Sequence, residues 1–159
     1  MLLGSSISAG RALRHSLRPA DARLAAVRVV VLASAISAGI HGALAPEHFA
    51  EGNGAGAGFL AAAVVLGALA LALTKWPTSV LALATALPVF VGLIGSYALA
   101  VTTGLPVLHP EVESVDGVAL FTKAVEATGL AALVTLLPRR AIGAVTPRPK
   151  GKLTCNARG

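Results

Sequence analysis

The sequence predicts an all-α protein, a four-helix transmembrane bundle, and three observations lead to that fold class. First, 55% of the 159 residues are hydrophobic and only 13% are charged, about half the charged fraction of an ordinary soluble domain. Second, aromatic residues make up only 4%, so small and aliphatic residues that let helices approach closely in lipid supply the apolar surface. Third, four apolar stretches are long enough to cross about 30 Å of hydrocarbon, which takes roughly 20 helical residues.

The four predicted spans cover about 24–44, 55–74, 80–103 and 118–137. Each must be a helix, because an open strand in lipid leaves its backbone N–H and C=O groups without partners. Together the spans predict one membrane domain over 24–137. The segments on either side, 1–23 and 138–159, are basic and lack apolar periodicity, so we expect flexible cytoplasmic tails.

The charges predict the orientation of the spans. Of 13 basic residues, all but Lys123 fall on one side of a four-span topology. These are Arg11, Arg14, Arg18, Arg23, Arg28, Lys75, Arg139, Arg140, Arg148, Lys150, Lys152 and Arg158. The two loops on the other side hold only acids among their charged residues, namely Glu47, Glu51, Glu111, Glu113 and Asp116. Because positive loops stay inside, we expect a multi-pass plasma membrane protein with both termini cytoplasmic.

Two glycine patterns and one basic pattern have simple interpretations in this topology. The run 52–58 resembles a phosphate-binding loop, but it lacks the Lys-Ser/Thr of that motif and follows a span. We interpret it as a hinge and a closely packed start to the second span, and Gly92 and Gly95 as a packed face of the third. The basic run 148–152 fits attraction to anionic lipid better than nucleic acid, so no nucleic-acid partner is expected.

Histidines and acids gather on the outer side and form a candidate metal site. The proposed ligands are His41, His48, Glu51 and His109, a set that would suit Zn or Cu(II) as the cofactor. Pro46 predicts a short interfacial helix over the residues that follow it. However, no HxH, HxxxH or HExxH spacing is present, so solvated acidic loops and interfacial histidines remain the alternative.

Polar residues within the spans form a second candidate site, namely Tyr97, Lys123 and Glu126. An ionisable group inside a span is costly and marks a functional site or a buried pair. Two readings of Glu126 stay open. It either pairs locally with Lys123, or it serves as a functional carboxylate beside His41 and Tyr97.

Three segments carry a resemblance to a known group of proteins. They are the HxxxxPEHxxE pattern over 41–51, Tyr97 followed by Thr-Thr-Gly-Leu-Pro over 102–106, and the KxxE pattern of Lys123 and Glu126. On these the chain resembles uncharacterised small four-helix integral membrane proteins of high-GC Gram-positive bacteria, over about residues 25–137. Val101 stands where such proteins often have a basic residue. The resemblance implies a four-helix bundle in the plasma membrane and no assigned reaction.

Function is expected to be non-enzymatic, because no nucleophile–base pattern appears in the sequence. The leading hypothesis is an outward His/Glu site that binds a transition metal, or a membrane-embedded or exported partner. The alternatives are a proton- or ion-coupled small transporter that uses Glu126, and a structural subunit of a larger membrane complex. Besides the lipid bilayer, we expect another copy of the chain or a membrane-complex subunit as partner.

Overall fold

The computed structural model describes residues 19–105 and 112–137, and in these ranges it is all-helical. The helices are α1 (Pro19–Glu51), α2 (Asn53–Lys75), α3 (Val80–Ala100) and α4 (Gly117–Leu136). All four are long and apolar enough to cross a membrane. The predicted fold class of four potential spans is therefore confirmed.

The main difference from the sequence prediction is the length of α1. It begins at Pro19 and continues through Pro46 to Glu51, 33 residues in all, which corresponds to about 50 Å. The separate interfacial helix expected after Pro46 is therefore wrong. Proline costs one helical hydrogen bond there, but its fixed φ is compatible with a helix. Only Gly52 separates α1 from α2, and its N–H donates to the His48 carbonyl at 3.0 Å.

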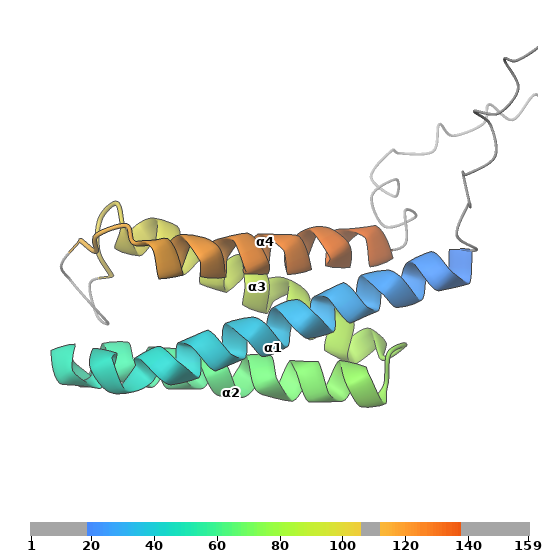
Figure 1. Cartoon of the computed structure of the whole chain (residues 1–159), viewed down its shortest axis with the longest axis horizontal. Coiled ribbons are helices and arrows are strands. Elements are labelled where there is room, and N and C mark those ends of the chain that lie inside the picture. The colour runs from blue at the N-terminus through green and yellow to red at the C-terminus, as the bar shows by residue number, and fades with distance from the viewer. Residues whose placement is uncertain (1–18, 106–111, 138–159) are drawn as a thin grey trace, which may run out of the picture.

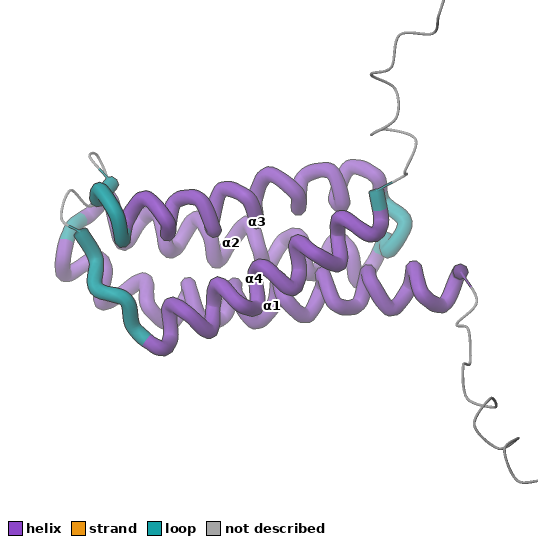
Figure 2. Tube along the Cα trace, turned by 90° about the horizontal axis from the view of Figure 1, so that it is seen from above, coloured by secondary structure: helices purple, strands orange, loops and turns teal. Residues whose placement is uncertain are grey.

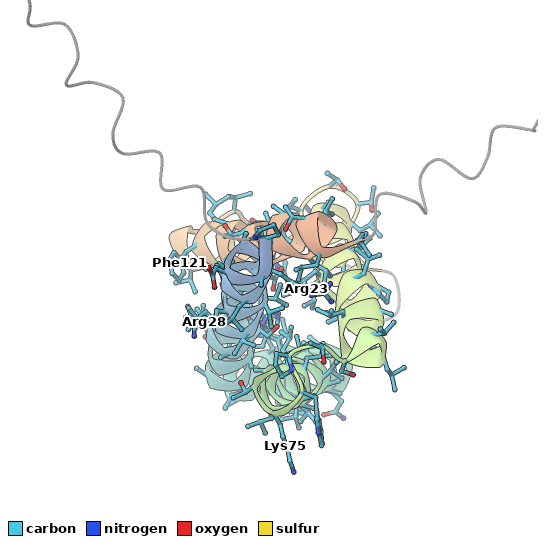
Figure 3. All side chains as sticks on the ribbon, turned by 90° about the vertical axis from the view of Figure 1, so that its right-hand side faces the viewer. Arg23, Arg28, Lys75 and Phe121 are labelled. Carbon is cyan, nitrogen blue, oxygen red and sulfur yellow. The ribbon has the colours of Figure 1, made fainter. Side chains whose placement is uncertain are left out.

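The four helices run alongside one another and share two ends (Figures 1 and 2). One end holds the start of α1, the α2–α3 turn and the end of α4. We call it the basic end, because Arg23, Arg28 and Lys75 are exposed there (Figure 3). The opposite end holds the α1–α2 connection and the segment before α4. We call it the acidic end, since it carries four acids, Glu47, Glu51, Glu113 and Asp116.

The helices form a ring in which each one packs against two neighbours. The most extensive interface joins α1 and α2, followed by that between α1 and α4. The α2–α3 interface is the smallest. Its described core contacts come from Leu66–Leu73 and Ala82–Phe90, the halves of these helices next to their connecting turn. Toward the acidic end, α2 and α3 therefore share little of this core.

The hydrophobic core fills the half of the bundle next to the basic end. Its members are Val30, Ala33, Leu66, Leu69, Leu73, Ala82, Leu83, Ala86, Phe90 and Leu133. Burying such side chains in close contact stabilises the helices through dispersion, because lipid offers little hydrophobic driving force between them. This half of the molecule is consequently the packed half.

Glycines mark two of the closest approaches. A Cβ at Gly129 of α4 would lie 2.8 Å from both Ala33 Cβ and Phe90 Cζ, so only glycine fits between α1 and α3 there. At Gly56 a Cβ would overlap the Phe49 ring, which confirms close packing at the start of α2. Gly92 and Gly95 are exposed, and a Cβ on either would meet no described atom within 4 Å. These two glycines therefore do not pack against another described helix of the same chain, and a packed face there stays a prediction for contacts with another molecule.

Candidate binding site

An ion pair lies inside the bundle between α3 and α4. Glu126, near the middle of α4, is completely buried, and its Oε2 accepts a hydrogen bond from Lys123 Nζ at 2.6 Å. Lys123 Nζ also donates to the Leu93 carbonyl of α3 at 3.2 Å. The same nitrogen lies 5.5 Å from the centroid of the Tyr97 ring. The structure thus contains the local pair, and Lys123 points to α3 instead of extending to solvent.

The other oxygen of Glu126 connects α4 to α1. Glu126 Oε1 accepts a hydrogen bond from Ser37 Oγ at 2.7 Å. The His41 Nδ1 lies 2.9 Å from the Ser37 carbonyl, and because a carbonyl only accepts, this nitrogen carries the proton. His41 Nε2 lies 4.0 Å from Glu126 Oε1. Both carboxylate oxygens therefore have a donor, and His41 stands beside one of them.

A cavity of about 240 Å³ occupies the half of the bundle next to the acidic end. All four helices line it, with Leu44, Phe59, Leu93 and Tyr97 among the walls and Glu113 and Asp116 toward the acidic end. His41 and Lys123 belong to the lining, whereas Glu126 does not. The ion pair consequently lies between the cavity and the apolar core.

Two buried hydroxyl groups have no hydrogen-bond partner among the described residues, those of Ser34 and Tyr97. Buried polar groups are nearly always paired, so each calls for an explanation. Tyr97 belongs to the lining of the cavity. Ser34 lies one turn before Ser37 on the face of α1 that holds the network, but it does not line the cavity.

The three proposed metal ligands that lie in the described residues, His41, His48 and Glu51, do not form a metal centre. His41 joins the Glu126 network, while His48 Nδ1 lies 3.0 Å from the Leu44 carbonyl and its ring stacks on Phe59 at 3.7 Å. Glu51 ends α1, and His109 lies outside the described residues. Across 19–105 and 112–137, no group of three His, Cys, Asp or Glu is arranged to hold a metal. The structure does not support metal binding.

The structure brings together the polar residues that were predicted within the spans. Tyr97, Lys123 and Glu126 lie in one cluster, with His41 beside it. Sequence reasoning missed Ser37, which donates to Glu126, and Phe59, whose ring contacts those of both His41 and His48. The spacing of Ser34, Ser37 and His41, at i, i+3 and i+7, is the signal that identifies Ser37, because it places all three on one helix face.

The structure is that of a four-helix chain with the length and hydropathy to cross a membrane and, in one half, a largely apolar cavity with a few polar groups. Comparison with protein families, curated proteins and solved structures finds no match to this chain.

Proposed function

We propose that the protein is a multi-pass plasma membrane protein with both termini in the cytoplasm. We further propose that it works without catalysis, as a receptor for a small amphipathic molecule in its outward-facing cavity. The observation that carries the proposal is the cavity of about 240 Å³, which combines apolar walls with a few convergent polar groups. Such cavities are the usual sites of small-molecule binding in proteins.

The distribution of charge supports the orientation. The described basic residues outside the cluster, Arg23, Arg28 and Lys75, belong to the basic end, and four acids belong to the acidic end. Since basic segments stay on the cytoplasmic side, the cavity end faces outward.

The hydrophobic core favours binding over conduction. Among the described residues, the buried polar side chains are Ser34, Ser37, His41, Thr122 and Glu126. On α1 none of them precedes Ser34, and on α4 none follows Glu126. On the side of Ser34 and Glu126 that is nearer the basic end lie Val30, Phe90 and Leu133, which are completely buried. An ion that reached Glu126 from the cavity would meet this apolar layer next, so the transporter alternative has less support.

Cysteine labelling tests the outward cavity. In a Cys155→Ser background, Ala119→Cys places a thiol on the cavity wall, and Ala132→Cys places one beside the hydrophobic core. We expect a membrane-impermeant maleimide added to intact cells to label Ala119→Cys and to spare Ala132→Cys. An Ala119→Cys thiol that reacts only after lysis would contradict the orientation. One that reacts in neither condition would contradict an accessible cavity.

A further inference from the structure

The geometry points to a neutral, lipid-soluble carbonyl compound as the ligand of the cavity, held by hydrogen bonds from Tyr97 and Lys123 to its oxygen. This inference rests on the proposed function and adds the chemical class of the ligand. Three properties of the described cavity lead to it, namely its unused hydrogen-bond donors, its charge balance and its apolar walls.

The cavity wall offers two unused donors. The buried Tyr97 hydroxyl has no partner among the described residues, and leaving a buried donor unpaired is energetically unfavourable. An ammonium group has three N–H donors. Lys123, which lines the cavity, directs two of them to Glu126 Oε2 and the Leu93 carbonyl, so its third N–H has no acceptor among the described residues. A ligand oxygen would satisfy donors that the described residues leave unpaired.

The charge balance of the cavity disfavours ions. The charge of Lys123 is already countered by Glu126 at 2.6 Å. An anionic ligand would in addition meet Glu113 and Asp116, which also line the cavity. A cationic ligand that reached the donors would meet the Lys123 ammonium. A neutral acceptor avoids both repulsions, and a carbonyl oxygen is the simplest group of that kind.

The surrounding walls require an apolar body on the ligand. Ile40, Leu44, Phe59 and Leu93 line the cavity. The cavity is also lined by residues of α2 over 55–62, before the core shared with α3, and by residues of α3 over 93–100, after that core. Since these stretches belong to helices with the hydropathy of membrane spans, the ligand would be dissolved in the bilayer.

The test uses duroquinone, a neutral dicarbonyl whose fully methylated ring cannot add to the Cys155 thiol. Its binding to the full chain in lipid nanodiscs is measured by filtration, with empty nanodiscs correcting for partition into lipid. Laurate, an anionic amphiphile, is the comparison ligand. We expect saturable binding of duroquinone, weakened about three- to tenfold by Tyr97→Phe, which removes one hydrogen bond. Thr128→Val removes an exposed hydroxyl from α4 away from the cavity and should leave binding unchanged.

The other outcomes separate this inference from the proposed function. Tighter binding of laurate than of duroquinone would overturn the neutral class while leaving the cavity as a receptor. Equal duroquinone binding by the parent and Tyr97→Phe would overturn the assigned contact. Saturable binding of neither compound, with Ala119→Cys still labelled from outside, would overturn the carbonyl inference alone. An unlabelled Ala119→Cys would instead remove the proposed function.

Discussion

Glu126 is a carboxylate buried in an apolar bundle. Its charge needs a cation nearby, and both of its oxygens need hydrogen-bond donors. Here Lys123 and Ser37 each donate to one oxygen, at 2.6 and 2.7 Å. The two donors come from different helices, so the carboxylate links α1 to α4. Removing Lys123 would leave the buried charge without its partner, and removing Ser37 would leave one carboxylate oxygen without its hydrogen bond.

We expect Lys123→Met to destabilise the protein strongly. The substitution keeps an unbranched apolar side chain but removes the ammonium group, so Glu126 would remain buried without a cation. Breaking a buried pair in this way costs on the order of 3–5 kcal/mol in soluble proteins. The measurement is the loss of helical circular dichroism during denaturation of the purified protein in mixed micelles.

The double variant Lys123→Met/Glu126→Gln provides the control, because it removes both charges and keeps an amide that hydrogen-bonds Ser37. Its stability should recover most of the loss. A Lys123→Met protein as stable as the parent would show that the pair does not hold α4 in place.

At the scale of the site, the sequence predicted part of this cluster. The spacing of Lys123 and Glu126, three residues apart, predicts their contact on any helix. The proximity of Tyr97 and His41 followed from similar expected depths in the membrane. Ser37 was missed because serine is common in membrane helices, and its partner lies 89 positions away in the chain. The cavity was also beyond reach, since the distances between helices depend on which side chains pack against which.

Among the helices, α4 depends on one glycine for its position. A Cβ at Gly129 would lie 2.8 Å from atoms of both Ala33 and Phe90, so α4 must move away to accept one. Gly129→Ala should therefore lower stability by about 1–3 kcal/mol, the usual cost of overpacking. Alanine favours the helical backbone, so a loss would report packing and not helix propensity. Thermal unfolding in detergent measures the effect.

Gly42 of α1 gives the matched comparison. A Cβ there would lie 3.7 Å from Ala63 Cβ, an ordinary contact, so Gly42→Ala should leave the melting temperature unchanged or raise it slightly. Equal effects of the two substitutions would mean that α4 adjusts easily and that Gly129 does not set its distance from α1.

The helices themselves were predictable because hydropathy and length suffice to identify spans. Their ends were less so. Pro46 is acceptable either at the start of a new helix or inside one that tolerates a missing hydrogen bond, and the sequence does not distinguish these cases. The structure has one continuous α1, so the residues after 44, where the span was expected to end, extend the same helix.

At the scale of the whole molecule, the separation of charge predicts which end faces the cytoplasm. The single cysteine, Cys155, lies in the basic segment after α4 and provides a natural reporter. A membrane-impermeant maleimide should not label it in intact cells and should label it after permeabilisation. A Glu47→Cys substitution in a Cys155→Ser background should give the opposite pattern, since Glu47 is exposed at the acidic end. Labelling of Cys155 in intact cells would overturn the proposed topology.

The division of the bundle into a packed half and a hollow half has a consequence for its fluctuations. Local opening costs less free energy where fewer side chains must separate, so the two halves differ in the free energy of local opening. The half built on Phe90, Leu66 and Leu133 resists opening. The stretch of α3 over 93–100, which borders the cavity, can shift at lower cost. Local opening of the bundle is therefore expected mainly in the part of α3 that faces the cavity.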